Sequence, residues 1–301
     1  MTETMTPTGD DSLAGTESVT EAESVAGTKS VTEAETVAGT KSVTEAETVA
    51  ATETFTPPTR FAVPGRIAVS EQAASVWQTA TLTEIRRETP RAATFRLAVP
   101  GWPGHLPGQH LMLRLTAADG YTAQRHYSIA SAPDESGHIE LTLDRVEDGE
   151  VSGWFHTVAR PGDTVEVRGP VSGFFAWPGD RPALLLGAGS GVVPLMSMVR
   201  HHRARGLAVP LRLLVSARSP QELIYAGEYG AETTPVFTRS APAGLPVGRL
   251  SAAHVAPVVA DAPEGGWEAY VCGSNAFAEH AARLLVEAGQ PVDRIRIERF
   301  G

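Results

Sequence analysis

The pattern of strand-like and helix-like segments changes near Pro182, and this change limits the possible folds more than any other feature of the sequence. From Val76 to Arg168 the sequence contains short segments rich in Thr, Val and Leu, separated by turn residues. Beyond Pro182, short apolar segments alternate with helical segments. The first pattern is typical of an antiparallel barrel or sandwich, and the second is typical of a parallel sheet wrapped by helices.

These segments divide the chain into three parts: a leader at 1–57, an all-β domain at 76–178 and an α/β domain at 181–301. In the all-β domain we predict strands 76–85, 92–99, 110–115, 127–130, 138–146 and 164–168, and a short helix at 150–158. In the α/β domain we predict strands 183–186, 211–215, 236–238, 270–272 and 295–297, with helices ending near 205 and spanning 220–227 and 275–288.

Within the leader, residues 15–50 consist of three 12-residue repeats, GTESVTEAESVA and two copies of GTKSVTEAETVA. Their only apolar residues are Val and Ala, which cannot bury enough surface to offset the entropy lost on ordering. We predict a disordered leader; the alternative is a transient helix, because Glu and Ala favour helices. Residues 1–57 carry eleven acids and two lysines, whereas the remainder has 24 acids and 23 arginines. This nearly neutral remainder argues against a nucleic-acid-binding surface.

The single cysteine, Cys272, excludes an intrachain disulfide and an iron–sulfur cluster held by four cysteines of this chain. No apolar run reaches the roughly 18–20 residues of a membrane span, and the N-terminus lacks the pattern of a secretory signal. We therefore expect a cytoplasmic protein. The nine histidines lack ligand spacing, so we expect no metal site, and we interpret Asp144 and Glu147 as solvated turn charges.

A glycine-rich segment follows the strand at 183–186 and opens a helix, reading GAGSGVVP from Gly187 to Pro194. Glycines at this point let backbone amides approach a pyrophosphate at the positive end of the helix. The alternative is that the glycines serve only close packing between strand and helix.

Three further segments suit nucleotide cofactors, the first two a flavin nucleotide and the third a nicotinamide ring. In Arg125-His126-Tyr127-Ser128, the aromatic ring could stack on a flavin, the hydroxyl could reach N5 and the guanidinium could meet phosphate; the alternative is an ordinary exposed strand. Residues 149–152, GEVS, stand at a predicted helix start with free amides, or form a plain helix cap. Residues 272–274, CGS, end a strand of the α/β domain, where a thiol could touch a ligand or simply be buried.

Taken in order, these segments and the closing ERFG at 298–301 resemble the motifs of the ferredoxin–NADP reductase superfamily. RHYS matches R-x-Y-[ST], GEVS matches G-x-x-S, and GAGSGVVP matches G-x-G-x-G-x-x-P. Residues 161–175 resemble the stretch that joins its two domains, so the resemblance covers 76–301. It implies an antiparallel six-stranded FAD-binding barrel followed by a Rossmann-like NAD(P)-binding domain.

The resemblance also implies roles for individual residues. Hydride transfer would take place among Ser128, Cys272, Glu298 and Phe300, with Phe300 on the flavin face that the nicotinamide must reach. FAD would be bound by Arg125, His126, Tyr127, Ser128, Gly149, Val151, Ser152 and Phe300. The nicotinamide nucleotide would be bound by Gly187, Gly189, Gly191, Pro194, Ser216, Arg218, Cys272, Gly273 and Ser274.

Arg218 and Ser216 favour NADPH over NADH, because they could hold a 2′-phosphate and no acid stands where a ribose 2′-hydroxyl would need one. The alternative is that Arg218 is an ordinary surface arginine.

From these features we predict an FAD-dependent oxidoreductase that takes hydride from NAD(P)H and passes electrons to a separate ferredoxin or oxygenase component. One alternative is a stand-alone flavin reductase or diaphorase that uses small acceptors. A second alternative is a scaffold without catalysis, in which the repeats at 15–50 are the working part. Deletion of residues 1–57 distinguishes the scaffold from the others, and we expect it to leave NAD(P)H oxidation little changed.

Overall fold

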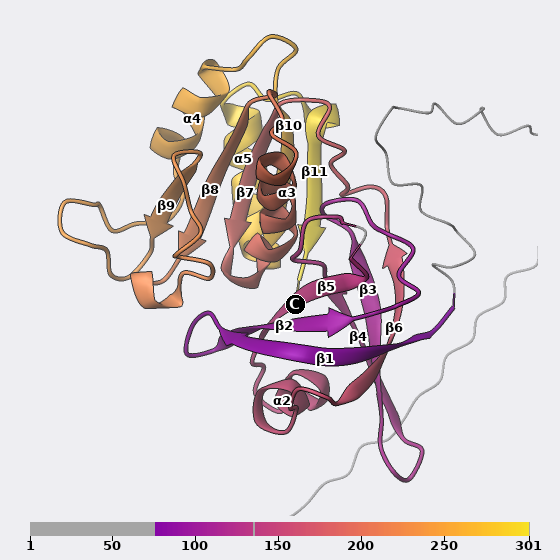
Figure 1. The fold of residues 1–301 in the computed structure, drawn as a ribbon. Helices are drawn as coiled ribbons and strands as arrows, with labels where there is room; N and C mark the ends of the chain where they lie inside the picture. The colour runs from indigo at the N-terminus through magenta and orange to yellow at the C-terminus, as the bar shows by residue number, and fades with distance from the viewer. Residues whose placement is uncertain (1–75, 135, 301) are drawn as a thin grey trace, which may run out of the picture. The chain divides into compact units, whose positions relative to one another are not determined.

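The computed structural model describes residues 76–134 and 136–300. The leader predicted at 1–57 lies outside the described residues, as does Gly301. All the described residues belong to one compact unit, which contains an antiparallel sheet followed by a parallel sheet (Figure 1). No helix in this part of the chain is both long enough and apolar enough to cross a bilayer.

The first sheet is a six-stranded antiparallel barrel, as predicted, with strand order β4-β3-β6-β1-β2-β5. Its strands are β1 (Gln78–Arg87), β2 (Ala92–Ala98), β3 (His110–Thr116), β4 (Thr122–Ser128), β5 (His138–Asp144) and β6 (Thr164–Val171). The two outer strands, β4 and β5, meet at the single isolated bridge Ile129–Leu141, so the described barrel has a seam between them. Helix α2 (Glu150–Thr157) follows β5 and buries Phe155 against the Phe95 ring, with centroids 4.8 Å apart.

Buried and partly exposed side chains alternate along the barrel strands, and this alternation forms the barrel core. On β3, Leu111 and Leu113 are fully buried, while Met112 between them is partly exposed. On β5, Ile139 and Leu141 follow the same period of two. Every second side chain of a strand faces the same way, so these residues fill the barrel interior.

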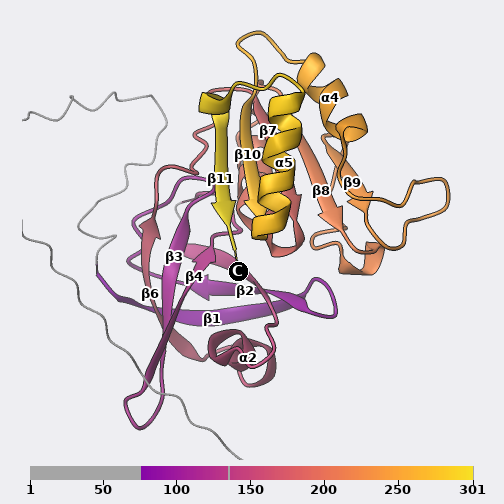
Figure 2. The same cartoon turned by 180° about the vertical axis from the view of Figure 1, so that it is seen from behind.

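The second sheet has five parallel strands in the order β11-β10-β7-β8-β9. The strands are β7 (Ala183–Ala188), β8 (Leu211–Ala217), β9 (Thr233–Phe237), β10 (Glu268–Gly273) and β11 (Ile295–Arg299). The helices are α3 (Val192–Ala204), α4 (Ala252–Ala260) and α5 (Asn275–Glu287), with short 3₁₀ turns η1 (Gly189–Gly191), η2 (Pro220–Glu222) and η3 (Val292–Arg294). Helix α3 covers one face, and α4 and α5 cover the other, as the two opposite views show (Figures 1 and 2).

Continuous apolar runs in the strands explain why helices cover both faces of the parallel sheet. Leu184, Leu185 and Leu186 of β7 are all fully buried, because both faces of the sheet are covered. Leu185 belongs to the cluster packed on α3, whereas Leu184 and Leu186 belong to the cluster packed on α4 and α5. The predicted order of an antiparallel barrel followed by a helix-covered parallel sheet is confirmed.

The strand order of the parallel sheet reverses between β7 and β10. From β7 the chain first adds β8 and β9 on one side, and then returns to add β10 and β11 on the other. Open α/β sheets bind ligands beyond the carboxyl ends of the strands at such a reversal. The glycine-rich turn at Gly189–Gly191 and the segment Gly273–Ser274 therefore emerge side by side at the expected place.

The structure differs most from the predicted elements in three places, beyond shifts of two or three residues at the ends of other strands. Strand β4 begins at Thr122, five residues before the predicted start. The helix predicted at 220–227 is only the 3₁₀ turn η2, because Leu223, Ile224 and Tyr225 are all buried and Tyr225 takes a left-handed φ of 62°. Helix α4 was not predicted, because it is short and contains Pro257.

Candidate active site at the junction of the two sheets

A narrow cleft of about 160 Å³ lies along the barrel seam. Its walls come from β4, from the end of β5, from the start of α3 and from the C-terminus: His126, Tyr127, Ser128, Thr142, Leu143, Asp144, Val146, Ser190, Val193 and Phe300. Among the described strands β4 pairs only with β3, so the backbone groups on its other edge belong to no ladder. Such an edge offers donors and acceptors to a flat polar ligand.

The segment predicted to hold a flavin lines this cleft in part. Tyr127 is mostly buried, and its burial raises the pKa of its hydroxyl to about 12. Ser128 is buried on the next position, and its Oγ has no hydrogen-bond partner within the described structure. Arg125 is exposed beside the cleft, where its guanidinium donates to the Gln124 carbonyl at 2.7 Å.

The start of α2 presents backbone amides, as expected of residues 149–152. Gly149 is the N-cap residue, and in the described structure no side chain caps the helix there. The Ser152 hydroxyl accepts a hydrogen bond from the Val146 amide at 3.2 Å and so keeps its own hydrogen for donation. Val151 is buried in the barrel core, so any contact of this residue with a phosphate would come from its amide.

A second cleft, of about 410 Å³, opens at the carboxyl ends of the parallel strands. It is lined by the glycine-rich turn, by the ends of β8 and β10, and by a barrel segment: Thr89, Arg91, Ala92, Asp144, Ala188, Gly189, Ser190, Gly191, Ser216, Ala217, Arg218, Glu222, Ile224, Thr238, Gly273, Ser274 and Phe300. It lies at the strand-order reversal described above.

The glycines of the turn serve two purposes. A Cβ on Gly191 would lie 2.3 Å from the Cys272 carbonyl oxygen, and a Cβ on Gly187 would lie 2.9 Å from Leu195 Cδ1. Close packing therefore explains these two glycines. Gly189 has a φ of 54° and open space around it, so it provides the turn that exposes the backbone to the cleft. Pro194 is buried in the first turn of α3, behind the cleft wall.

Arg218 and Ser216 both line the second cleft, at the end of β8. The structure adds an acid that the sequence analysis did not place there: Glu222 lies 3.6 Å from the Arg218 guanidinium and lines the same cleft. The sequence analysis assigned Glu222 to a predicted helix at 220–227, whereas the structure places it at the end of the turn η2.

The two clefts share three wall residues, Asp144, Ser190 and Phe300. The Phe300 amide donates to the Gly273 carbonyl at 3.0 Å, which fixes the C-terminal aromatic between them. Asp144 was interpreted as a solvated turn charge; its side chain is 38% exposed, but the residue does not lie in a turn. This residue ends β5, lies 3.5 Å from the Arg91 guanidinium, and lines both clefts.

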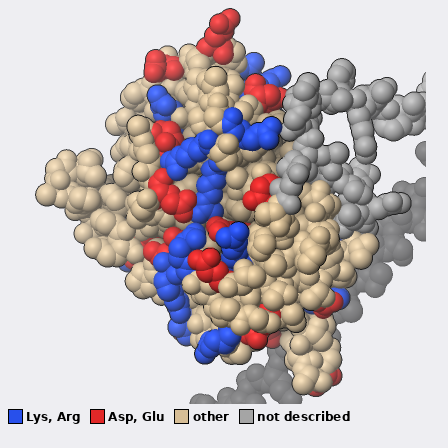
Figure 3. Space-filling model, viewed as in Figure 1, with Lys and Arg blue, Asp and Glu red and all other residues tan. Residues whose placement is uncertain are grey.

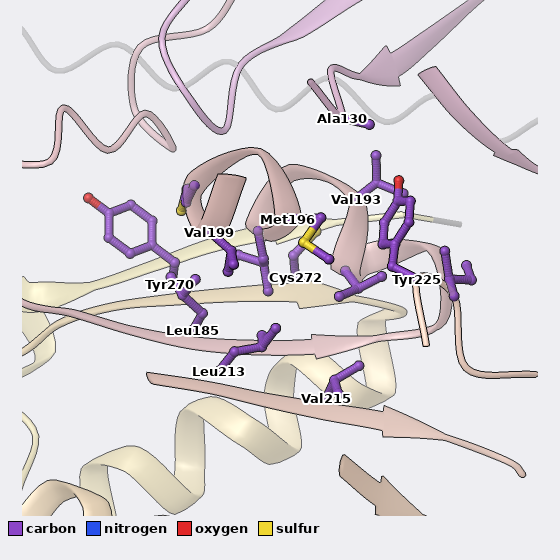
Figure 4. Packing of buried hydrophobic residues seen from close by; sticks show 14 of the residues in the cluster. Ala130, Leu185, Val193, Met196, Val199, Leu213, Val215, Tyr225, Tyr270 and Cys272 are labelled. Atoms are coloured by element: carbon purple, nitrogen blue, oxygen red, sulfur yellow. The ribbon is translucent and has the colours of Figure 1, made fainter. Parts of the chain in front are cut away.

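Glu298 and Cys272 lie next to each other on β11 and β10, as register partners. The Cys272 side chain is fully buried in the apolar cluster with Met196 and Leu185 (Figure 4). Burial, and secondarily the Glu298 carboxylate, raises the pKa of the Cys272 thiol well above its usual value. This environment favours the protonated thiol over the thiolate.

His110 joins the predicted residues across the two sheets, and sequence reasoning missed it. Its Nδ1 lies 3.1 Å from Glu298 Oε1, although the two atoms are not aligned as a hydrogen bond. It stands opposite Ser128 in the β3–β4 ladder. The sequence signal that could have identified His110 is its position at the start of β3, the strand that pairs with the RHYS segment. Ser128, Cys272 and Glu298, predicted as one group, are thus brought to one junction.

A partly buried ionic network joins the two halves. Arg200 of α3 donates to Glu140 of β5 at 3.0 Å, to Glu228 at 2.6 Å and to the Ala130 carbonyl at 2.8 Å. Burial lowers the pKa of Arg200, but the two carboxylates outweigh it and the pKa is raised. In Figure 3, positive and negative side chains alternate along a band that crosses this face between the two sheets.

Among the described residues there is no group of three or more His, Cys, Asp or Glu side chains placed to hold a metal ion. A family model described as an oxidoreductase FAD-binding domain matches residues 79–176, which are the barrel and the start of the connection to the second sheet.

Two curated relatives are reductase components. The chain is 32% identical, over 64% of its length, to the ferredoxin reductase component of 3-ketosteroid-9-alpha-monooxygenase from Mycolicibacterium smegmatis. It is also 32% identical, over 65% of its length, to the glycine betaine monooxygenase reductase subunit of Chromohalobacter salexigens. The matches span only 55% and 56% of the lengths of these two relatives.

Among solved structures, a ferredoxin NADP⁺ reductase from Neisseria gonorrhoeae with bound FAD and NADP superposes with a TM-score of 0.63. The match covers 74% of this chain and 98% of that chain at 20% identity. The two proteins therefore share a fold.

Proposed function

We propose that the chain is an NAD(P)H-dependent flavoprotein reductase, since residues 79–176 match a family model described as an oxidoreductase FAD-binding domain, and the chain shares its fold with a ferredoxin NADP⁺ reductase. The observation that carries the proposal is the meeting of two clefts at Phe300. One cleft runs along the seam of the barrel, and the other opens at the strand-order reversal of the parallel sheet. A reductase of this kind must bring two nucleotides together at one point.

The seam cleft fits a flavin. Ser128 Oγ is a buried polar atom without a partner, which is costly unless a ligand completes its hydrogen bonding. The free edge of β4 supplies backbone groups beside it, and Tyr127 supplies a flat ring. We propose that Tyr127 and Phe300 contact the ring system, that Ser128 binds near N5, and that Arg125 and the amides at the start of α2 hold the phosphates.

A bound flavin supplies the redox chemistry, because it accepts hydride as an electron pair and can release electrons singly. The protein supplies position. Phe300, Gly273 and Ser274 form the wall that the nicotinamide must approach, and the glycine-rich turn with the N-terminus of α3 receives the pyrophosphate. We propose a packing role for Cys272 beside this wall, since its thiol is fully buried.

The choice between NADPH and NADH rests on Arg218 and its neighbour. We propose that Arg218 and Ser216 bind the 2′-phosphate of NADPH. We also propose that Glu222 weakens the preference for NADPH over NADH, because its carboxylate competes with the phosphate for the Arg218 guanidinium. Arg218→Ala should raise KM for NADPH and hardly change KM for NADH. Glu222→Gln should lower KM for NADPH alone. Equal effects of Arg218→Ala on both nucleotides would assign the 2′-position to other residues.

For the acceptor, we propose a separate ferredoxin or oxygenase component. The curated relatives are reductase components of monooxygenase systems, and the single cysteine of this chain leaves no cysteine set for its own iron–sulfur cluster. A stand-alone flavin reductase or diaphorase that uses small acceptors is the second candidate. We further propose a cytoplasmic location, because one cysteine suits a reducing compartment.

The test begins with the absorption spectrum of the purified protein, followed by anaerobic addition of NADPH or NADH. Flavin bands that bleach with either nucleotide support the proposal, and a protein that neither contains FAD nor takes it up refutes it. Turnover is then compared with a ferredoxin, free flavin and a quinone as acceptors. Faster turnover with ferredoxin supports the electron-transfer role, and faster turnover with small acceptors supports the diaphorase.

A further inference from the structure

One tyrosine of the parallel-sheet half forms a buried hydrogen bond with the barrel half. The Tyr225 hydroxyl donates to Thr142 Oγ1 of β5 at 2.5 Å. The exposed fractions of these two residues are only 1% and 5%. Figure 4 shows the Tyr225 ring extending away from Val215 of the parallel sheet. Burial raises the pKa of the Tyr225 hydroxyl, so this group keeps its hydrogen and remains a donor.

The bond continues as a chain of hydroxyl groups across the barrel. Thr142 stands opposite Thr94 of β2 in the antiparallel ladder, and their Oγ1 atoms are 2.7 Å apart. Thr94 Oγ1 donates to the Glu88 carboxylate at 2.7 Å, which uses its only hydrogen. Thr142 must therefore donate to Thr94 and accept from Tyr225. Each hydroxyl donates once, so the direction of the chain is fixed from Tyr225 to Glu88.

The two ends of the Tyr225–Thr142 bond belong to the walls of different clefts. Thr142 lines the seam cleft. On β5 it faces away from the barrel interior, which Leu141 and Leu143 on either side of it fill. Ile224, the residue before Tyr225, lines the second cleft. The bond therefore fastens the wall of the cleft proposed for the nicotinamide nucleotide to the wall of the cleft proposed for the flavin.

The backbone at Tyr225 takes a conformation that a bulky residue rarely adopts. Its φ of 62° lies in the left-handed region. Such a conformation persists only where the surrounding contacts determine it. The Arg200 guanidinium lies over the Tyr225 ring, 4.8 Å from its centroid, and the bond to Thr142 is the second restraint. Ring and hydroxyl together fix a segment that belongs to no helix or strand after η2 ends at Glu222.

We propose that Tyr225 is a positioning residue for the reductase reaction, whose hydroxyl holds the nicotinamide-binding wall at a fixed distance from the flavin-binding wall. This inference rests on the proposed function, because it concerns the distance between the same two clefts. Tyr225 lies outside both cleft walls and acts through Thr142 and Ile224. Hydride transfer depends steeply on this distance, since a misplacement of about 1 Å can reduce a rate by about 10²-fold.

The test uses the full-length flavoprotein and Tyr225→Phe, which removes the hydroxyl and keeps the ring beside Arg200. Anaerobic stopped-flow gives the rate of reduction at saturating NADPH or NADH. Titration with NADP⁺ or NAD⁺ gives Kd from the change in flavin absorbance. We expect the saturating rate to fall about tenfold and Kd to stay within about twofold, because the nucleotide keeps its own contacts but meets the flavin at a changed distance. A residue that only supports folding would not separate these two quantities.

A second measurement does not depend on turnover. The Leu223 amide donates to the Pro220 carbonyl and closes the turn η2. Its hydrogen–deuterium exchange should be roughly 2–12-fold faster in Tyr225→Phe, the factor that corresponds to the usual net contribution of one hydrogen bond. Unchanged exchange would show that the hydroxyl does not hold this segment, and would overturn the inference.

The matched control is Tyr270→Phe. Tyr270 is also a buried tyrosine of the parallel sheet, and its hydroxyl donates to the Ala176 carbonyl at 3.4 Å, but it lies outside both cleft walls. Its rate, its Kd and the exchange at η2 should be unchanged. Thr142→Val removes the acceptor without altering Tyr225, so the inference stays testable if Tyr225→Phe folds poorly. Thr142→Ser keeps the hydroxyl and should retain the rate.

The double variant distinguishes one shared contact from two independent defects. If the bond is the cause, Tyr225→Phe combined with Thr142→Val should be reduced no more slowly than the slower single variant. Single effects that multiply in the double variant would overturn the role of the bond and leave the reductase function intact. A normal saturating rate in Tyr225→Phe would do the same. A wild-type protein that neither nucleotide can reduce would overturn the proposed function, and this inference with it.

Discussion

Replacement of Gly191 by alanine should damage nucleotide use without affecting the flavin. The new Cβ would lie 2.3 Å from the Cys272 carbonyl oxygen and 2.6 Å from Gly273 Cα, whereas ordinary contacts begin at 3.4 Å. Relief of the overlap with the oxygen requires the start of α3 to move about 1 Å away from β10. Both neighbours are backbone atoms of a buried strand, so they cannot turn aside as a flexible side chain could.

The energetic cost follows from this displacement. Overpacking of a tight interface typically costs about 1–3 kcal/mol, which for a protein of this size lowers Tm by about 2–12 °C. The catalytic cost should be larger, because a 1 Å misplacement of a reacting group can reduce the rate by about 10²-fold. We expect kcat/KM for the nicotinamide nucleotide to fall about 10–100-fold.

The assay measures FAD content, Tm and the rate of anaerobic reduction for Gly191→Ala and for a control, Gly227→Ala. A Cβ on Gly227 meets nothing within 4 Å, and this residue lies outside both cleft walls. FAD content should stay unchanged in both variants, because the flavin cleft belongs chiefly to the barrel. A Gly191→Ala protein that is reduced at the normal rate would refute the argument that this glycine sets the distance between α3 and β10.

Three further outcomes are expected. Tyr127→Ala should weaken FAD binding about tenfold or more in Kd, because stacked aromatic area is lost; unchanged FAD content would argue against stacking. Arg200→Met should lower the free energy of unfolding by about 2–3 kcal/mol in denaturant unfolding. Removal of one partner from a fully buried ion pair costs ~3–5 kcal/mol, and the cost here is smaller because Glu228 is partly exposed. A loss of stability below ~0.5 kcal/mol would show that the network contributes little. Burial lowers the pKa of His105 from 6.5 to about 4, so the unfolded chain binds the extra proton between these values. Stability should therefore fall by about 3 kcal/mol as pH drops through that window, and His105→Gln should remove most of this slope in pH-dependent unfolding.

Burial lowers the pKa of His105, and the hydrogen bonds of its ring fit the neutral form. Its Nδ1 accepts a hydrogen bond from the Trp102 indole at 3.2 Å, so a proton on that nitrogen would break the bond. Its Nε2 lies 3.1 Å from the Ser131 carbonyl and donates to it in the neutral tautomer. The ring is therefore satisfied only when it is uncharged.

The sequence predicted the two sheets well, because both patterns depend on neighbouring residues. Alternation at Leu111 and Leu113, and the unbroken apolar run at Leu184–Leu186, are local signals of a half-covered and a fully covered sheet. The glycine-rich turn was also visible, because a turn between a strand and a helix has local requirements.

The remaining parts of the site depend on contacts between distant segments. Nothing in the sequence near His110 indicates that Glu298 stands 3.1 Å away, since that pair joins the start of one sheet to the end of the other. Glu222 was missed and Asp144 was placed in a turn for a similar reason. Glu222 lies in a turn and Asp144 at the end of a strand, and both line the second cleft, whose walls come from both halves of the molecule. Helix α4 was missed because Pro257 masks a helix that Ser251 and His254 cap in reciprocal fashion.

Helix α3 contacts both halves of the molecule and should couple their thermal unfolding. It begins at the glycine-rich turn, and farther along Ser197 donates to the Ser131 carbonyl at 2.6 Å. Its Val193 and Met196 share an apolar cluster with Ala130 of the barrel half. In calorimetric terms, we expect these two halves to melt together in one transition, since α3 packs its apolar side chains in one cluster with Ala92 and Ala130 of the barrel half. A nucleotide bound at the start of α3 should then raise the melting temperature of the barrel as much as that of the parallel sheet.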